Sequence, residues 1–217
     1  GDILWEVELE DYRIGYAATL APLVLDDKVI VGISGGEYRT RGFIDAYDPE
    51  SGERLWRFNT IPGPGEPGSE TWPDDPEVLA AGGGGTWMNG SFDPDLNLIY
   101  WGVGNPNPDY YGEARPGDNL YSNSLLALDA DSGELRWHYQ FTPHDLNDWD
   151  SNHMPVLAEV NWQGRLRQVV MVGNRNGFFY VLDRVTGELL LGKPFTATSW
   201  ARELDAAGRP IVLNDGS

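Results

Sequence analysis

One pattern, A-x-D-x-x-x-G-x-x-x-W, recurs along the chain and constrains its fold more than any other feature of the sequence. Complete copies occupy Ala46–Trp56 and Ala127–Trp137. A third copy covers Val181–Leu191, with Val in place of the Ala and Leu in place of the Trp. The opening residues Gly1–Trp5 fit the end of a fourth copy. Such self-similarity predicts a series of equivalent structural units rather than one irregular core.

The chemistry of the pattern predicts a β-hairpin in each copy. An apolar strand ends at the Asp, whose carboxylate can accept hydrogen bonds from backbone amides of the turn, and the Gly supplies a positive φ. A second strand then leads to the Trp, which we expect to pack against the neighbouring unit. Trp5, Trp56 and Trp137 are 51 and 81 residues apart, and Leu191 follows after another 54. Four-stranded repeats of about 40–50 residues are typical of β-propeller blades.

The sequence therefore predicts an all-β protein rich in turns, with about four propeller blades. The 27 Gly, the many aromatic residues and the lack of a convincing helical period agree with this class. Because a propeller closes on itself to remove its sheet edges, we expect this chain to be part of a larger ring. The alternatives are a complete small propeller and a sandwich of unrelated hairpins.

Charge and composition exclude several classes of partner. The formal net charge of −19 over 217 residues argues against nucleic acid or an anionic membrane, and suits a cation or a basic protein. The chain has no Cys, which excludes disulfides and thiolate chemistry within it. No run of about 18 apolar residues is present, so we expect no membrane span in this stretch.

Two long stretches, Ile61–Gly85 and Asn105–Asn123, show neither strand nor helix periodicity. Loops of this length inside a compact domain are usually functional or disordered. The first stretch ends in four consecutive Gly residues, Gly82–Gly85, directly before Thr86 and Trp87. Such a run predicts backbone that passes close to something bulky.

A third irregular segment, Thr142–Asp150, concentrates negative charge. Pro143 keeps it out of a regular helix or strand, and it carries Asp145, Asp148 and Asp150. Crowded carboxylates repel one another, so the arrangement costs stability unless a cation or a catalytic task offsets the repulsion. The alternative is an acidic surface turn without further function.

Oxygen donors on separate loops indicate a site for a hard cation. The candidates are Glu37, Asn105, Asp148 and Asp150. Such donors suit Ca²⁺ or a larger trivalent ion rather than Zn²⁺. Loops of different blades can meet at one mouth of a propeller channel.

Two further side chains suit a flat organic ligand. Trp87 offers an apolar plate for a conjugated ring, and Arg175 offers a fork of donors for carbonyl oxygens. Each candidate also has a structural interpretation. Trp87 can simply pack within a blade, Asn105 can form a turn before Pro106, and Glu37 can form a surface ion pair with a nearby Arg.

The repeat and these motifs together resemble the quinoprotein alcohol dehydrogenases, the methanol and ethanol dehydrogenase group that uses pyrroloquinoline quinone (PQQ). The resemblance extends from Thr19 to about Gly187. It implies an eight-bladed propeller, of which residues 1–217 would be one partial domain of about four blades. The family's vicinal Cys pair would then lie upstream of Gly1.

The resemblance implies a set of cofactor contacts. Ser34–Gly42 resembles the segment whose Ser and Gly backbone contacts the quinone carboxylates, and Gly85–Trp87 resembles the one whose Trp lies beneath the ring. Asn174–Gly177 resembles the segment whose Arg hydrogen-bonds the reactive quinone oxygens. The implied cofactor-binding residues are Thr19, Ser34, Gly35, Gly36, Thr86, Trp87 and Arg175.

The resemblance also implies a metal ion and a catalytic base. The implied metal ligands are Glu37, Asn105, Asp148 and Asp150, for a lanthanide(III) ion or Ca²⁺. Asp148 matches the family's catalytic base, with the register counted from His144 because Leu146–Asn147 departs from the commoner His-Asp-x-Trp-Asp pattern. An Asp two residues after the base, here Asp150, resembles the lanthanide-dependent members.

The implied activity is oxidation of a primary alcohol to an aldehyde by hydride transfer to metal-bound PQQ, with Asp148 taking the hydroxyl proton. The family would pass the electrons to a cytochrome c in the periplasm. A competing hypothesis is a non-catalytic propeller with the same repeat, acting as a scaffold in outer-membrane protein assembly. Such a scaffold needs neither the oxygen donors nor Trp87. A PQQ sugar dehydrogenase is disfavoured by the combination of Glu37, Asn105 and Asp148.

Overall fold

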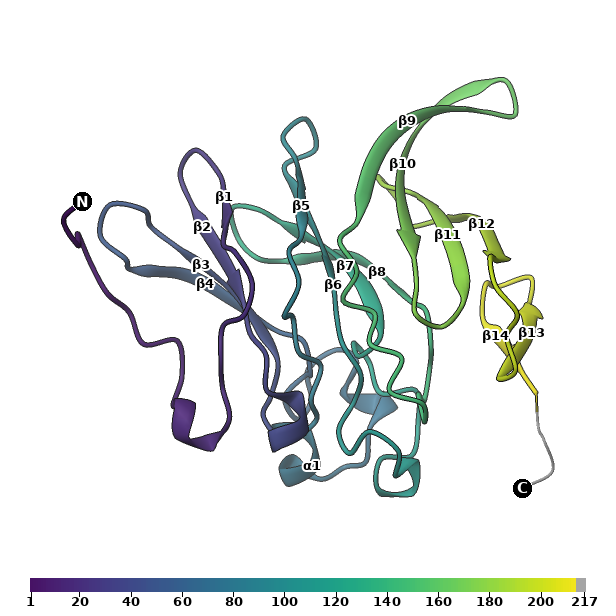
Figure 1. Cartoon of the computed structure of the whole chain (residues 1–217), viewed down its shortest axis with the longest axis horizontal. Helices are drawn as coiled ribbons and strands as arrows, with labels where there is room; N and C mark the ends of the chain where they lie inside the picture. The colour runs from purple at the N-terminus through teal and green to yellow at the C-terminus, as the bar shows by residue number, and fades with distance from the viewer. Residues whose placement is uncertain (214–217) are drawn as a thin grey trace.

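A computed structural model describes residues 1–213 as a row of antiparallel sheets (Figure 1). Three sheets have four strands each, in the sequence order of their strands, and a fourth has two. The first contains β1 (Leu23–Val24), β2 (Val29–Gly32), β3 (Phe43–Tyr47) and β4 (Arg54–Asn59). The second contains β5 (Ser91–Asp93), β6 (Leu98–Gly102), β7 (Ser124–Asp129) and β8 (Leu135–Gln140). The third contains β9 (Val156–Trp162), β10 (Arg165–Gly173), β11 (Phe178–Asp183) and β12 (Leu189–Pro194), and the last pairs β13 (Ala201–Leu204) with β14 (Pro210–Val212).

The predicted hairpins are the third and fourth strands of each four-stranded sheet. Ala46 pairs with Trp56 in the first sheet, and Ala127 pairs with Trp137 in the second. Val181 pairs with Leu191 in the third, so Leu191 does occupy the position of the Trp. The propeller-blade architecture is confirmed, as three four-stranded blades followed by a two-stranded sheet within the described residues.

Each Trp of the repeat packs on the turn of the next blade. Trp56 donates a hydrogen bond from Nε1 to the carbonyl of Ala130 at 3.0 Å. Its ring covers Gly133, where a Cβ atom would lie 2.6 Å from the indole and where φ is +71°. The Gly thus supplies both the turn conformation and the space for the indole. Trp5 packs on Gly52 and Trp137 on Gly187 in the same way.

The middle blade is buried on both faces, which explains its continuous apolar strands. Leu126 and Leu128 of β7 belong to the core shared with the first blade. Leu125 and Ala127, which alternate with them, belong to the core shared with the third blade, together with Val170. Because side chains of a strand point alternately to its two faces, one strand serves both interfaces.

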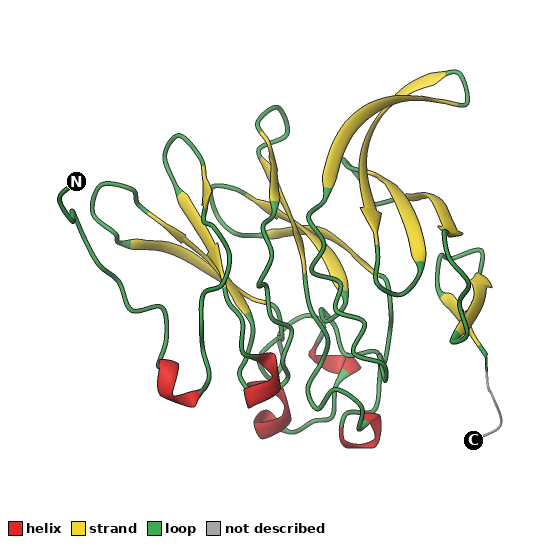
Figure 2. Cartoon of the chain, in the orientation of Figure 1, coloured by secondary structure: helices red, strands yellow, loops and turns green. Residues whose placement is uncertain are grey.

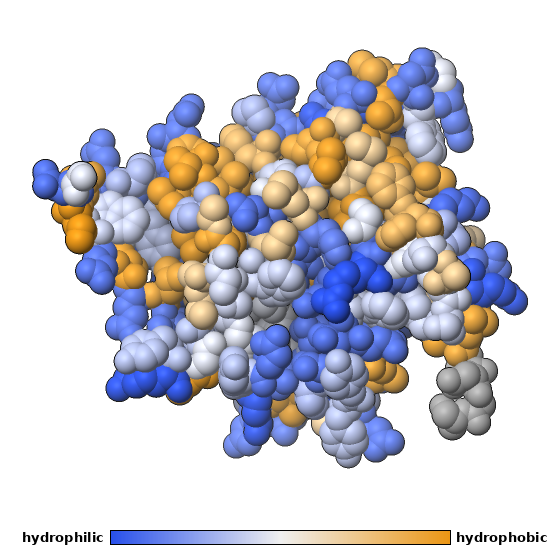
Figure 3. All heavy atoms as spheres, in the orientation of Figure 1, coloured by the Kyte–Doolittle hydropathy of each residue, from blue (hydrophilic) through white to orange (hydrophobic). Residues whose placement is uncertain are grey.

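The long loops and all short helices lie at one end of the blades, the lower end in Figures 1 and 2. The helical turns are η1 (Tyr12–Ile14), η2 (Gly36–Tyr38), η3 (Ser69–Thr71), α1 (Pro76–Ala80) and η4 (Gly112–Ala114). On the face shown in Figure 3, apolar side chains gather over the strands and polar ones over these loops. No helix within residues 1–213 is long and apolar enough to cross a membrane.

The segment Ile61–Gly85 is more ordered than its sequence indicated. It contains α1, which begins with Pro76 after Asp75, whose side chain accepts a hydrogen bond from the amide of Glu77. A single turn is too short to show a helical period, although an N-capping Asp before a Pro is a helix-start signal. Ile61, Trp72 and Leu79 form a small buried core beneath it.

The glycine run passes between two other segments of the protein itself. Gly83 bridges Arg41 on one side and Pro106 on the other. A Cβ on Gly83 would lie 2.8 Å from the amide nitrogen of Asn107, and one on Gly84 would lie 2.7 Å from Ile61. The close approach predicted for this run is therefore to neighbouring backbone and to the small core of Ile61.

Candidate functional site

Most of the predicted site residues meet around one cavity at the loop end of the blades. The cavity has a volume of about 160 Å³. Its lining is Thr19, Ser34, Gly35, Gly36, Glu37, Gly85, Trp87, Asn105 and Asp150. These residues come from the loops of the first two blades and from the acidic segment before the third. Of the predicted site residues, Thr86, Asp148 and Arg175 are not part of this lining.

The wall formed by residues 34–37 is fixed by backbone contacts. Ser34 and Ala17 exchange backbone hydrogen bonds of 2.8 and 3.2 Å, which brings the Thr19 segment beside this wall. Gly35 has a φ of +117°, and a Cβ there would lie 2.2 Å from the carbonyl oxygen of Gly15. Only glycine fits this position, and the turn then places Glu37 on η2 at the cavity.

Thr86 anchors the next wall rather than lining it. Its side chain is fully buried, and Oγ1 accepts a hydrogen bond from the amide of Ile33 at 2.8 Å and donates to the carbonyl of Phe43 at 2.6 Å. Both hydrogen bonds of the Thr86 hydroxyl therefore join it to the first blade. Trp87, the next residue, lines the cavity and directs Nε1 toward Asp150 Oδ1 at 3.4 Å.

Asp150 lies at the centre of the charged contacts. Its side chain is only 13% exposed, and its Oδ2 lies 3.2 Å from Nη1 of Arg175. Burial and the neighbouring Asp148 carboxylate raise the pKa of Asp150 to about 6. Arg175 thus reaches the site through Asp150, although it does not line the cavity.

Asp148 lies beside this centre on a constrained backbone. Its φ is +58° and that of Asp150 is +43°, both in the left-handed region that non-glycine residues rarely adopt. Strained backbone of this kind is concentrated at functional sites. Tyr110 directs its hydroxyl toward Asp148 Oδ2 at 3.4 Å.

The third acid of the segment, Asp145, has a different environment. It is 1% exposed. Its carboxylate accepts hydrogen bonds from the amides of Asn147 and Trp149 and from Nδ2 of Asn123, at 2.8–2.9 Å. Burial raises its pKa. Asp145 therefore shapes the loop that carries Asp148, and His144 contributes by contacting the carbonyl of Gly117 through Nδ1 at 2.8 Å.

Sequence reasoning missed two residues that support the site, Asp109 and Arg115. Asn105 donates a hydrogen bond from Nδ2 to Asp109 Oδ1 at 2.7 Å. Burial and the nearby carboxylates of Asp148 and Glu37 raise the pKa of Asp109. The only sequence signal for Asp109 was its place four residues after Asn105 in an aperiodic stretch.

Arg115 is a fully buried guanidinium that connects two of the site loops. It donates to the carbonyls of Pro108 and Asp109 at 2.8 Å each and to the carbonyl of Asp145. Burial lowers its pKa to about 10, with Asp145 and Asp109 opposing that shift. A buried Arg is rare without partners, and its backbone partners are visible only in the folded structure.

The donor set fits a hard cation, although the ligands are not fully preassembled. No three Asp, Glu or His side chains within residues 1–213 stand close enough together to hold a metal by themselves. Glu37, Asn105 and Asp150 nevertheless share one cavity, and all bring oxygen atoms. After burial, the negative charge of Asp148 raises the pKa of both Asp109 and Asp150, because like charges repel. An ion with several oxygen ligands would relieve that repulsion.

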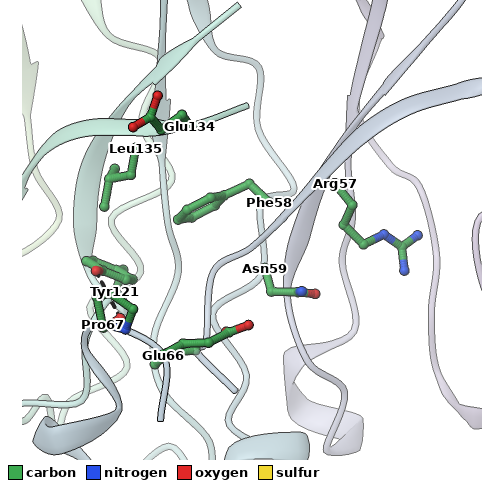
Figure 4. A pocket seen from close by; sticks show the side chains of 9 residues that line it. Arg57, Phe58, Asn59, Glu66, Pro67, Tyr121, Glu134 and Leu135 are labelled. Atoms are coloured by element: carbon green, nitrogen blue, oxygen red, sulfur yellow. Dashed lines mark hydrogen bonds between the residues drawn. The ribbon is translucent and has the colours of Figure 1, made fainter. Parts of the chain in front are cut away.

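A larger cavity lies elsewhere. It has a volume of about 490 Å³ and opens between the outer strands of the first two blades, beside Phe58, Tyr121 and Leu135 (Figure 4). Arg57 at its edge is paired with Asp45 at 2.7 Å. None of the predicted site residues contributes to this cavity.

Comparison with known proteins identifies the family to which this chain belongs. The family described as glucose/ethanol/alcohol dehydrogenase, β-propeller domain, matches residues 2–194. The quinoprotein alcohol dehydrogenase PedH of Pseudomonas putida is 40% identical over 236 residues, covering 100% of this chain and 39% of PedH. The lanthanide-dependent methanol dehydrogenase of Methylacidiphilum fumariolicum is 38% identical, covering 98% of this chain and 38% of that protein.

Solved structures agree with the fold. A europium-containing methanol dehydrogenase superimposes with a TM-score of 0.92 at 37% identity, covering 97% of this chain and 39% of that one. The quinohemoprotein alcohol dehydrogenase of Comamonas testosteroni gives a TM-score of 0.85 at 41% identity, covering 91% and 31%. The chain belongs to the PQQ-dependent alcohol dehydrogenase family, and it spans about two fifths of the length of the curated relatives PedH and the Methylacidiphilum enzyme.

Proposed function

We propose that the protein carrying this chain oxidises a primary alcohol to an aldehyde with PQQ and a bound metal ion. One observation carries the proposal. Glu37, Asn105 and Asp150, which lie far apart in the sequence, line the same cavity as Trp87. Oxygen donors beside an aromatic plate suit a metal-bound planar cofactor, and the family to which the chain belongs uses one.

The residues of this chain have distinct tasks in the proposed reaction. Bound PQQ and its metal ion would supply the hydride acceptor and the Lewis acid. Glu37, Asn105, Asp148 and Asp150 would hold the ion, and Trp87 would support the cofactor ring. Ser34, Gly35 and Gly36 form the adjacent wall, with Thr19 beside them.

Asp148 is the proposed general base. Its carboxylate lies next to Asp150 on a loop that Asp145 and Arg115 hold in place. An ionised carboxylate can accept the hydroxyl proton while hydride leaves the carbinol carbon, and a positioned base of this kind contributes about 10²–10⁴-fold to rate. Asp145 cannot take this role readily, because its oxygens already accept three hydrogen bonds.

We further propose that a lanthanide serves better than Ca²⁺. Asp150 adds a carboxylate to those of Glu37 and Asp148, and trivalent ions favour more negative charge than Ca²⁺ requires. Two relatives bear on this proposal by name, a lanthanide-dependent methanol dehydrogenase and a europium-containing one. The net charge of −19 suits a basic electron acceptor, for which we propose a cytochrome c in the periplasm.

The test is reconstitution of the complete protein. It is incubated with PQQ and either La³⁺ or Ca²⁺, and reduction of an artificial electron acceptor is followed after addition of ethanol or other primary alcohols. We expect turnover that requires PQQ and metal together, with La³⁺ giving the higher rate. Absence of turnover with every alcohol would favour the non-catalytic scaffold, and equal rates with both ions would reject the lanthanide preference.

A further inference from the structure

The orientation of the Asn105 amide is determined by its neighbours. Nδ2 donates to Asp109 Oδ1 at 2.7 Å and lies 3.3 Å from the carbonyl oxygen of Pro106. An ionised carboxylate and a backbone carbonyl only accept hydrogen bonds, so the nitrogen of the amide faces them. Oδ1 is then left for the cavity that Asn105 lines, and no donor within the described residues contacts it.

Of the two acceptors, Asp109 is the stronger one. A carboxylate accepts a shorter and stronger hydrogen bond than a neutral carbonyl, as the two distances indicate. Without Asp109, only the longer contact with Pro106 would hold the amide against rotation. The carboxylate therefore determines which end of the Asn105 side chain points into the cavity.

Asp109 is itself held in place by Arg115. The guanidinium donates to the carbonyl oxygens of Pro108 and Asp109 at 2.8 Å each. These two hydrogen bonds hold the backbone that carries the Asp109 carboxylate. Arg115 is fully buried and also contacts the carbonyl of Asp145. The position of Asp109 is thus tied to the loop that carries Asp148.

The carboxylate is kept in this place although its surroundings disfavour it. Asp109 is half-buried and lies near two other acids, Glu37 and Asp148, while no cationic side chain within residues 1–213 forms a salt bridge with it. Burial of a charged group beside like charges costs stability. The one side-chain hydrogen bond that the Asp109 carboxylate accepts within the described residues is the one from Asn105.

We propose that Asp109 is a positioning residue, which holds the Asn105 amide with its oxygen directed toward the metal ion and acts through Asn105. This inference rests on the proposed function, because it requires an ion at the cavity. Partners in the second coordination sphere that orient a ligand typically change metal affinity by about 10–100-fold when they are removed.

The experiment measures metal affinity rather than turnover. Tb³⁺ is titrated into the complete protein in the presence of PQQ, and binding is followed by terbium luminescence excited through tryptophan. Asp109→Ala should weaken Tb³⁺ binding by about 10-fold or more. Asp109→Asn keeps an acceptor oxygen for the Asn105 amide and should restore most of the lost affinity. Asp95→Ala, in the exposed β5–β6 turn at the far end of the blade, is the matched control and should bind like the unmodified protein.

A double-mutant cycle separates positioning from simple charge attraction. In an Asn105→Ala background, Asp109→Ala should cause no further loss of Tb³⁺ affinity, because there is no amide left to orient. An equal loss in both backgrounds would show that Asp109 acts by its charge and would overturn the inference. So would unchanged binding by Asp109→Ala in the unmodified background. If the unmodified protein showed no saturable Tb³⁺ binding, the metal site itself would be refuted, and the inference with it. Circular dichroism and the unfolding temperature of every variant identify any loss of fold, in which case Asp109→Asn carries the comparison.

Discussion

At the scale of single residues, the acidic segment contains three carboxylates with three different environments. Asp145 is buried and accepts three hydrogen bonds, and Asp150 is nearly buried beside Arg175. Asp148 accepts the fewest hydrogen bonds of the three, with one contact from the Tyr110 hydroxyl. The sequence spacing alone does not separate these environments. What separates them is the number of hydrogen bonds that each carboxylate already accepts, because a carboxylate without committed donors can still take a proton.

This difference predicts opposite effects for two substitutions. Asp148→Asn should leave the unfolding temperature near that of the unmodified protein and reduce turnover by at least about 10²-fold, the usual scale for a positioned base. Asp145→Ala would leave the amides of Asn147 and Trp149 and Nδ2 of Asn123 without their acceptor. Each buried unsatisfied donor costs about 1–3 kcal/mol, so this variant should unfold at a clearly lower temperature. Unaltered turnover in Asp148→Asn would assign the base to another group.

A second residue-scale prediction concerns the choice of metal. Asp150→Ala removes one of the carboxylates proposed for the ion and also releases Arg175 and Trp87 from their contacts. The trivalent ion should lose more than Ca²⁺ does, because it depends more on ligand charge. We expect the ratio of Tb³⁺ to Ca²⁺ affinity, measured by competition titration, to fall at least about 10-fold, because loss of a direct ligand should cost no less than loss of a partner that only orients one. A ratio unchanged by the substitution would exclude Asp150 as a ligand. Arg136→Ala, at an exposed pair on the second blade, serves as the control.

At the scale of structural elements, the repeat turn is the unit that joins one blade to the next. Gly133 has a φ of +71° and lies under Trp56, whereas Gly164 has a φ of +80° with nothing near the position of its missing Cβ. The two residues share the backbone requirement, but Gly133 is buried under the docked indole whereas Gly164 is exposed in the β9–β10 turn. Comparing them separates the cost of the turn from the cost of docking.

We therefore expect Gly133→Ala to destabilise the protein more than Gly164→Ala. The left-handed backbone should cost both variants about 1–2 kcal/mol. Gly133→Ala should lose roughly another 1–3 kcal/mol, the usual cost of forcing extra volume into a packed contact, because its methyl group would overlap Trp56. Chemical denaturation of both variants measures the difference. Equal destabilisation would mean that the Trp–Gly contact contributes little to the joining of blades.

The same scale shows what could be predicted from the sequence and what could not. The hairpins and the position of Leu191 followed from the spacing of Asp, Gly and Trp, because these residues act within one local turn. The convergence of Glu37, Asn105 and Asp150 followed from family motifs. The small core under α1, and the bonds of Arg115 to two separate loops, depend on contacts between segments far apart in the sequence. No local pattern encodes such contacts.

At the scale of the whole molecule, the cavity is small for the ligand proposed. Its volume is about 160 Å³, whereas pockets for small organic ligands commonly enclose about 300–1,000 Å³. The described blades form an open row rather than a closed ring (Figure 1). Apolar side chains such as those of Val24 on β1 and Val156 on β9 are exposed at 69% and 55%. Further walls would be needed to enclose a planar cofactor on both faces.

The last prediction follows from this geometry. Residues 1–217 produced alone should bind PQQ with a Kd weaker than about 1 μM, because Trp87 offers one face of a sandwich and the other face stays open to water. Equilibrium dialysis of PQQ against the isolated chain, with La³⁺ present, gives the measurement, and circular dichroism confirms that the chain is folded. The complete protein under the same conditions should bind PQQ at least about 10-fold more tightly, a difference of about 1.4 kcal/mol. Submicromolar binding by residues 1–217 would mean that these loops alone hold the cofactor, and that the remaining walls serve the substrate or the electron acceptor instead.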